Sequence, residues 1–179
     1  MFNEREKLKK YGLELQSFDN VVLKHLYPQP RPNEPLTQFY TEPTMIGSPH
    51  YEIASLFFKK GEEWLREHYE ETRYSKMLKA MDKPNFPEKI ISLSKSLEKG
   101  YLQGDHKEDY IVILNEPFAH SRYGRKDVNL SFVPEVWSGH HRVGILLALG
   151  YDRADVLVAK DLKPGSKLTD GKIHKYCLE

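Results

Sequence analysis

One short segment constrains this chain more than any other. At residues 136–150 an apolar run stops at Gly139, is followed by three basic side chains at positions 140–142, and continues as an apolar helix that ends at Gly150. A glycine lets the backbone approach a ligand closely, a helix start offers N–H groups and a positive dipole end, and Arg142 can make a bidentate contact. The segment predicts an anion site with phosphate as its ligand; a structural strand-turn-helix corner is the alternative interpretation.

The size and charge of the chain limit its classes of function. Its 179 residues suit one domain with a sizeable core. Lysine plus arginine (27) nearly balance aspartate plus glutamate (26), so the basic excess of a nonspecific DNA-binding protein is missing, although a local basic patch is allowed. The single cysteine, Cys177, excludes an internal disulfide. Because no cationic apolar leader or long apolar span occurs, we expect a soluble cytoplasmic protein without a membrane partner.

The first half of the chain is expected to be partly helical. Residues 21–26 fit a short strand, and the proline-rich segment at 27–35 imposes an extended path. Ser48-Pro49 is typical of a helix start, and apolar residues recur at helical spacing as far as Met77, which predicts two helices split near Gly61. Their aromatic residues are interpreted as core or as a lid over the next segment, with a cofactor contact as the minor alternative.

The second half has the alternating pattern of an α/β unit. Pro87 opens an apolar-faced helix that Gly100 can end, and we expect this helix to pack on a sheet. Strands are predicted at 110–114, 132–137 and 154–159, with a polar loop at 118–127 and a helix from His141 to Gly150. The order is therefore helix, strand, loop, strand, helix, strand.

This order and its motif resemble the ParB/sulfiredoxin superfamily over roughly residues 86–162. The motif is of Gly-x-His-Arg type, with Gly139, His141 and Arg142, and its helix ends in Leu-Gly before a Val-rich strand. The resemblance implies an α/β (α+β) fold, a small mixed sheet with packed helices. Residues 1–85 would be an N-terminal helical extension and residues 86–179 the phosphate-binding core. It also implies that the matching turn binds nucleotide phosphates, with His140 beside it.

Two departures from the superfamily narrow the expected function. Sulfiredoxins carry a reactive cysteine immediately before the His-Arg pair, where this chain has His140, so sulfinic-acid repair is not expected. ParB partition proteins add a helix-turn-helix DNA reader, whereas only residues 162–179 follow the last predicted strand. The resemblance then points to small ParB-like proteins that act as nucleotide-dependent kinases or accompany sugar- and base-modifying enzymes. Such kinases often have Asp-Gly before His-Arg; here it is Ser138-Gly139.

The favoured chemistry is phosphoryl transfer from ATP, or from another nucleotide, with Mg²⁺. Such transfer needs cations over the phosphates and a group that deprotonates or orients the acceptor. The predicted nucleotide-binding residues are Ser138, Gly139, His140, His141, Arg142 and, in the preceding loop, Arg122. Arg125 and His120 are second candidates, with solvated loop charges as the alternative interpretation.

Glu135 and His141 are the predicted catalytic residues. Glu116 and Asp109 also lie near strand ends and could serve as base or Mg²⁺ ligand, and no spacing selects among the three carboxylates. We expect no protein-bound metal site from His120, His140 and His141. Adjacent side chains at a helix start diverge by about 100° per residue, so at most one of His140 and His141 would easily point at a shared metal ion. Trp137 could stack on a base, although packing under the helix is the more ordinary role.

Two classes of function stay open at this point. One is an ATP-dependent small-molecule phosphotransferase, or a nucleotide hydrolase built on the same site. The other is a non-catalytic ParB-like module that binds nucleotide or nucleic acid. A ParB-like nuclease is the least favoured alternative, because a near-neutral chain has little positive charge with which to bind a duplex. The sequence leaves the acceptor and the oligomeric state open.

Overall fold

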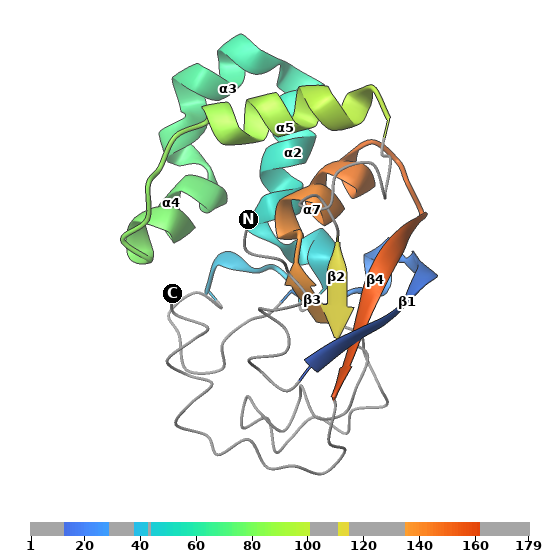
Figure 1. Ribbon diagram of the computed structural model, residues 1–179. Helices are drawn as coiled ribbons and strands as arrows, with labels where there is room; N and C mark the ends of the chain where they lie inside the picture. Colours follow the sequence, from blue (N-terminus) through green and yellow to red (C-terminus); the bar gives the residue numbers. More distant parts are fainter. Residues whose placement is uncertain (1–12, 29–37, 43, 101–110, 115–134, 162–179) are drawn as a thin grey trace.

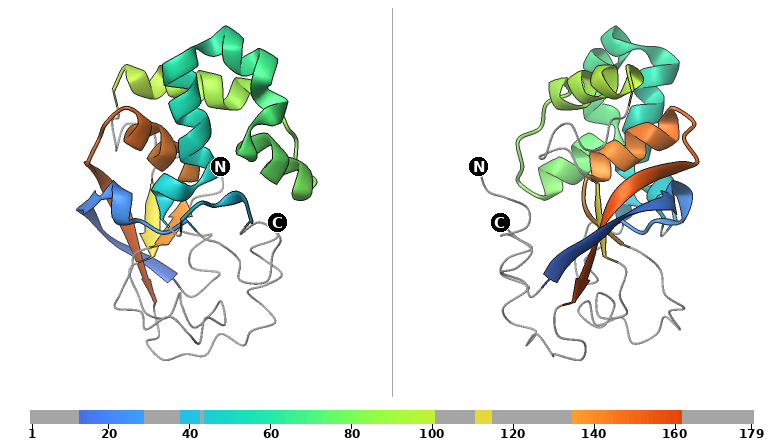
Figure 2. Two further views of the ribbon diagram at one scale, coloured as in Figure 1. Left: turned by 180° about the vertical axis from the view of Figure 1, so that it is seen from behind. Right: turned by 45° about the vertical axis from the view of Figure 1, so that its right-hand side comes forward.

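A computed structural model describes residues 13–28, 38–42, 44–100, 111–114 and 135–161. In this part of the chain, α-helices gather at one side of a small mixed sheet, as two further views also show (Figures 1 and 2). The predicted mixture of helices with a small mixed sheet is confirmed.

Within the described residues, the sheet has four strands in the order β1-β4-β2-β3. They are β1 (Leu13–Val22), β4 (Arg153–Asp161), β2 (Val112–Leu114) and β3 (Glu135–Ser138). The β1–β4 and β2–β3 pairs are antiparallel, and β2 is parallel to β4. The sheet therefore combines strands from both sides of residue 85. The division into a 1–85 extension and an 86–179 core stays a prediction, with β1 already part of the described sheet.

The first strand differs from its prediction. The sequence predicts a strand at 21–26, whereas the structure ends β1 at Val22 and continues with a 3₁₀ turn, Leu23–His25. Leu23 and Leu26 are both fully buried. Side chains three residues apart share a face in a 3₁₀ turn but point to opposite faces of a strand, so this spacing favours the turn.

Three helices, rather than the predicted two, follow the proline-rich segment: α2 (Pro49–Lys60), α3 (Glu62–His68) and α4 (Arg73–Ala80). The predicted start and split are confirmed, because the Ser48 side chain accepts a hydrogen bond from the Tyr51 N–H and Gly61 ends α2 with φ of 91°. The additional helix begins where the Thr72 hydroxyl caps the Ser75 N–H at 3.1 Å. An N-cap of this kind starts a new helix.

The predicted helix after Pro87 is confirmed as α5 (Glu88–Glu98), but its predicted packing is wrong. We expected α5 to cover the sheet, and it packs on α2 and α7 (His140–Ala148) instead. The physical reason is that α7 already occupies the sheet face. Its residues Val143 and Leu146 are in one core cluster with the strand residues Ile113, Val136, Val156 and Val158.

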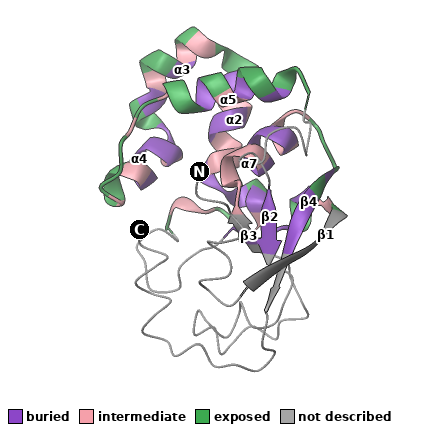
Figure 3. Ribbon diagram, viewed as in Figure 1, coloured by how far each residue is buried: buried purple, intermediate pink, exposed green. Residues whose placement is uncertain are grey.

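Helix α7 is apolar on two sides because it lies between the sheet and the other helices. Ile145 packs with Ala54 of α2 and Leu97 of α5. Figure 3 shows buried residues on α2, α7 and the central strands, with exposed residues concentrated on the outer faces of α3 and α5. The predicted core role of the helix after the glycine turn is confirmed.

A glycine inside α7 sets how closely α2 approaches it. A Cβ at Gly144 would lie 2.7 Å from the carbonyl carbon of His50 and 2.8 Å from its oxygen. No side chain fits at those distances, so the first turn of α2 crosses α7 in direct contact with its backbone. This crossing brings His50 beside the start of α7.

Candidate functional site

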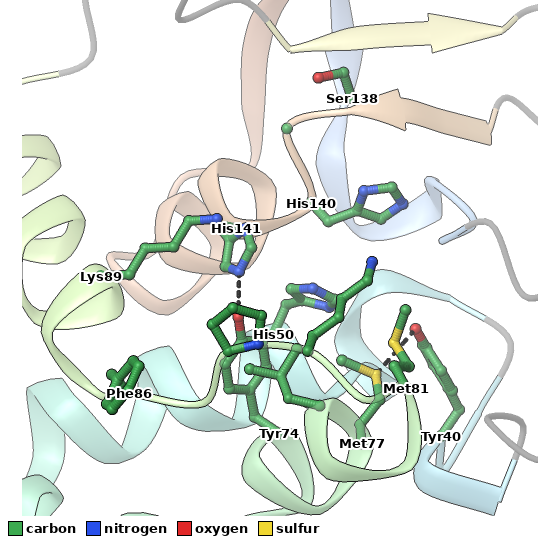
Figure 4. Close-up of a pocket in the computed structure, with 14 residues that line it drawn as sticks. Tyr40, His50, Tyr74, Met77, Met81, Phe86, Lys89, Ser138, His140 and His141 are labelled. Atoms are coloured by element: carbon green, nitrogen blue, oxygen red, sulfur yellow. Dashed lines mark hydrogen bonds between the residues drawn. The ribbon is translucent and has the colours of Figure 1, made fainter. Parts of the chain in front are cut away.

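A cavity of about 530 Å³ lies where the start of α7 meets α2, α4 and the connection between α4 and α5 (Figure 4). We call it the α7 pocket. Its described lining consists of Tyr40, His50, Tyr74, Met77, Leu78, Met81, Lys83, Pro84, Phe86, Lys89, Ser138, Gly139, His140 and His141. Its volume falls in the range of sites that hold one small-molecule ligand.

Gly139 forms the turn from β3 into α7. Its φ of 97° lies in the left-handed region that favours glycine, and its carbonyl accepts the Val143 N–H at 3.0 Å. A Cβ at this position would lie 3.1 Å from Cα of Ile111. The glycine is therefore required by the turn and by packing against the residue before β2. The corner interpretation is thus supported by geometry, and Gly139 lines the pocket as well.

Three imidazoles meet at the floor of this pocket. The ring centre of His50 lies 4.8 Å from that of His141 and 5.5 Å from that of His140. Tyr74 joins them: its ring centre is 5.3 Å from that of His50, and its Oη lies 2.5 Å from Nε2 of His141 (Figure 4). We call His50, His140 and His141 the imidazole cluster.

Burial keeps the imidazole cluster uncharged at neutral pH. Desolvation is the main cause that lowers the pKa of His140 to about 4 and that of His141 to about 3, and it places the pKa of His50 well below its ordinary value. Nearby cations add to the effect, with Lys89 second to burial at His141 and Lys83 second at His140. The histidines of the glycine motif are therefore not the positive charges that their sequence pattern predicts.

The hydrogen bond between Tyr74 and His141 fixes where the protons lie. Burial raises the pKa of Tyr74, so the phenol is also neutral. A phenol O–H is a stronger acid than a neutral imidazole N–H, so Tyr74 donates to Nε2 of His141 and the imidazole proton lies on Nδ1. His141 is then a hydrogen-bond donor held in one orientation.

His50 brings an unsatisfied nitrogen to the cluster as far as the described residues go. Its Nδ1 is buried and makes no hydrogen bond to any of them. A buried polar atom in this condition costs free energy, which a ligand in the pocket could recover. His50 therefore adds an unsatisfied polar group to the pocket.

Two lysines, Lys83 and Lys89, supply positive charge to the α7 pocket. Lys89, in the first turn of α5, extends toward the His141 ring, and Lys83 lies in the connection before α5 (Figure 4). Both residues are exposed at the rim. None of the described lining residues is acidic. The described part of the wall therefore favours an anion.

The structure brings together four of the six predicted nucleotide-binding residues: Ser138, Gly139, His140 and His141 line one pocket. Arg142 is half-buried on α7 and close enough to His141 to lower its pKa, but it is not among the lining residues. Its predicted phosphate contact stays a prediction.

The remaining predicted residues are not placed in the pocket. Glu135 begins β3 opposite Leu114, and its backbone is about 10 Å from that of Ser138 at about 3.3 Å per strand residue. Its catalytic role stays a prediction. The loop candidates lie outside the described residues; they are Arg122, His120, Arg125, Glu116 and Asp109.

Sequence reasoning missed His50, Tyr74 and Lys89. Tyr74 lies in the helical stretch whose aromatic residues are interpreted as core or lid, and His50 follows the recognised Ser48-Pro49 helix start. The signal that could have found the contact was Gly144, because a glycine inside an apolar helix often marks close packing against another element. That signal indicates contact without naming the partner.

Neither a metal-ligand cluster nor a membrane-spanning helix occurs in the described residues. They contain no group of three or more histidine, cysteine, aspartate or glutamate side chains arranged to hold a metal ion. The described lining also has no carboxylate, and Mg²⁺ usually takes one or two together with phosphate oxygens, so these residues alone do not form a Mg²⁺ site. None of the described helices has the length and hydropathy needed to cross a bilayer.

Comparison with known proteins gives no match to a protein family, to a curated protein or to a solved structure. The chemistry of the α7 pocket therefore has to be inferred from its own residues.

Proposed function

We propose that this protein binds a nucleotide, with ATP as the first candidate, by its phosphates in the α7 pocket and transfers a phosphoryl group to a small-molecule acceptor. One observation carries the proposal: the start of α7, Lys83 and Lys89 converge on one cavity whose described lining contains no acidic residue. The resemblance of the Gly139 turn to nucleotide-binding turns of the ParB/sulfiredoxin superfamily supports it.

The phosphate would be held by charge from the rim and by neutral donors from the floor. The positive end of a helix dipole equals roughly half an elementary charge, and α7 is long enough, at nine residues, to contribute it. Lys89 and Lys83 add full charges at the rim. His141, with its proton on Nδ1, donates without bringing a charge of its own. An anion in this position meets donors and cations without an opposing carboxylate in the described wall.

The arrangement shifts the predicted charge neutralisation from Arg142 to Lys89. Arg142 follows the histidines on α7 but does not line the pocket, whereas Lys89 does. We therefore assign the main phosphate charge contact to Lys89 and treat a contact from Arg142 as the secondary hypothesis.

The proposed reaction is a displacement at the terminal phosphorus. An acceptor hydroxyl oxygen forms the new O–P bond, the bond from that phosphorus to the bridging oxygen breaks, and ADP leaves with the electron pair of the broken bond on that oxygen. The acceptor proton passes to a base, for which Glu135 is our proposal.

A binding module without turnover is the second candidate. It is favoured by one observation, the lack of a carboxylate in the described lining, because phosphotransferases commonly use one to orient the acceptor or Mg²⁺. Release of ADP that depends on added acceptor would favour the enzyme, and nucleotide binding without release would favour the module.

Calorimetric titration tests the shared premise. ATP, ADP and CTP are titrated with and without Mg²⁺ into the original protein and into the Lys89→Ala, Arg142→Ala and Lys99→Ala variants. Lys99→Ala is the matched control, because Lys99 is exposed at the other end of α5, about 15 Å along the helix from Lys89. We expect Lys89→Ala to weaken ATP binding at least about tenfold, as loss of a charged hydrogen bond does, and Lys99→Ala to leave it unchanged. No heat with any nucleotide would overturn the proposal.

A further inference from the structure

The α7 pocket is lined by two chemically different sets of side chains. Besides the imidazole cluster and the lysines, the described lining contains apolar and thioether side chains, which we call the apolar wall: Tyr40, Met77, Leu78, Met81, Pro84 and Phe86. A phosphate group alone would make no favourable contact with these apolar side chains. The combination of cationic and apolar side chains is typical of a site for a ligand that is itself anionic at one end and apolar at the other.

Hydrogen bonds between described residues hold the apolar wall in place. The connection between α4 and α5 folds back on α4, where the Lys83 N–H donates to the Leu78 carbonyl at 3.0 Å and the Asn85 side-chain amide donates to the Ser75 hydroxyl at 2.9 Å. The Tyr40 hydroxyl meets the Met77 sulfur at 3.9 Å. These contacts hold Lys83 and Phe86 on the same short connection, so one segment carries both a charge for the phosphate and a ring for an apolar group.

Phe86 is the unusual member of the wall. The residue is 68% exposed, the highest value among the exposed large hydrophobic residues described in this chain. A lone exposed phenylalanine needs no explanation, but this one lines the same cavity as Met77 and Met81. A ligand ring packed on Phe86 would cover the phenylalanine, and the methionines elsewhere in the lining offer polarisable sulfur to the rest of the ligand.

We propose that the apolar wall binds the base of the nucleotide whose phosphates lie at the start of α7. This inference rests on the proposed function. The cavity of about 530 Å³ is in the range for one small ligand, so a single nucleotide would contact both sets of side chains and the acceptor would approach from the mouth. The described wall offers ring faces, thioethers and methylenes, which recognise a flat ring by shape, so adenine and guanine are bound alike.

The test separates the base from the phosphates. ATP, GTP and tripolyphosphate are titrated at one fixed salt concentration into the original protein and into three variants: Phe86→Ala, Phe86→Tyr and Tyr151→Ala. Tyr151 is the control, an exposed aromatic residue that follows α7 at its far end and does not line the pocket. Phe86→Tyr keeps the ring and serves as the rescue. Thermal unfolding of each variant confirms that it is folded.

We expect ATP and GTP to bind with similar affinities, both tighter than tripolyphosphate. Phe86→Ala should weaken ATP by about tenfold, in line with the loss of one base-stacking contact, and leave tripolyphosphate unchanged. Phe86→Tyr and Tyr151→Ala should bind ATP as the original protein does. If tripolyphosphate binds as tightly as ATP and Phe86→Ala changes neither, the base contact is wrong while the phosphate site stands. If neither ATP, GTP nor tripolyphosphate binds, both the proposed phosphate site and the proposed base contact are wrong.

Discussion

The buried floor of the α7 pocket and its exposed rim are held in opposite ways. On the floor, His141 is fixed by Tyr74, and the crossing at Gly144 holds His50 against the backbone of α7. At the rim, Lys89 and Phe86 are exposed. The floor has already lost its water in the folded protein, and the rim loses it only when a ligand binds. Changes on the floor should therefore cost stability, and changes at the rim should cost binding.

Acid should destabilise the buried floor of the pocket most. The native pKa of His140 is about 4 and that of His141 about 3, whereas an unfolded histidine has about 6.5, so below pH 6.5 the unfolded chain binds more protons. The free energy of unfolding therefore falls as the pH falls, by up to about 1.4 kcal/mol per pH unit for each histidine. Urea unfolding at pH 7 and pH 5 measures the loss.

Histidine variants test whether the imidazole cluster causes this pH-dependent loss of stability. His140→Gln should reduce the difference between pH 7 and pH 5, and His25→Gln, at an exposed side chain, is the matched control that should not. An equal pH dependence in all three proteins would contradict the buried, neutral cluster.

Leu146→Ala should lower the free energy of unfolding more than any substitution at the pocket rim. Leu146 is fully buried between α7 and the sheet, and removing such a side chain costs about 2–5 kcal/mol. Denaturant unfolding measures the change, with Phe86→Ala at the rim as the comparison, expected within about 0.5 kcal/mol. A loss within experimental error for Leu146→Ala would contradict the packing of α7 on the sheet.

Gly144→Ala should destabilise by about 1–3 kcal/mol, the usual cost of forcing atoms into a packed contact. The added methyl group has to displace the backbone at His50, so nucleotide binding should weaken as well. Urea unfolding and ATP titration measure the two effects. In an open helical position the same substitution would stabilise by about 1 kcal/mol through helix propensity. A stabilised variant would therefore show that α2 and α7 are not in contact there.

Lys89→Ala should have the smallest effect on folding. The residue is exposed, and surface substitutions of this kind change the free energy of unfolding by less than about 0.5 kcal/mol. Its effect should appear in nucleotide titration instead. A variant that unfolds more easily but binds normally would contradict the comparison between the buried floor and the exposed rim.

Local chemistry made part of this molecule predictable. Ser48 caps a helix, Gly61 ends it, and Gly139 starts another with a left-handed turn; each effect depends on a few neighbouring residues. These signals placed α2 and α7 in the sequence. The first strand was predicted at 21–26 and observed at 13–22, so only its last two residues were found. Leu23 and Leu26, which were assigned to the strand, belong to the turn that follows it and to the end of that turn.

Long-range contacts were beyond the same reasoning. Nothing near His50 in the sequence says that it meets His141, since that contact depends on how α2 crosses α7. Lys89 was likewise not predicted as a site residue, because we expected α5 to pack on the sheet. In the structure α5 packs on helices instead. The turn at Gly139 was recognised, but the charges and rings around it come from elsewhere in the chain.

The pairing of β1 with β4 has a consequence for the order of folding. Asn20 and Arg153, whose side chains are hydrogen-bonded across these strands, are 133 positions apart. Contacts so distant in the chain form slowly, because a long loop has to close before they stabilise anything, whereas helices α2 to α5 are joined by short connections. The helical half is therefore expected to assemble first, and the α7 pocket becomes complete only when the distant strands have met.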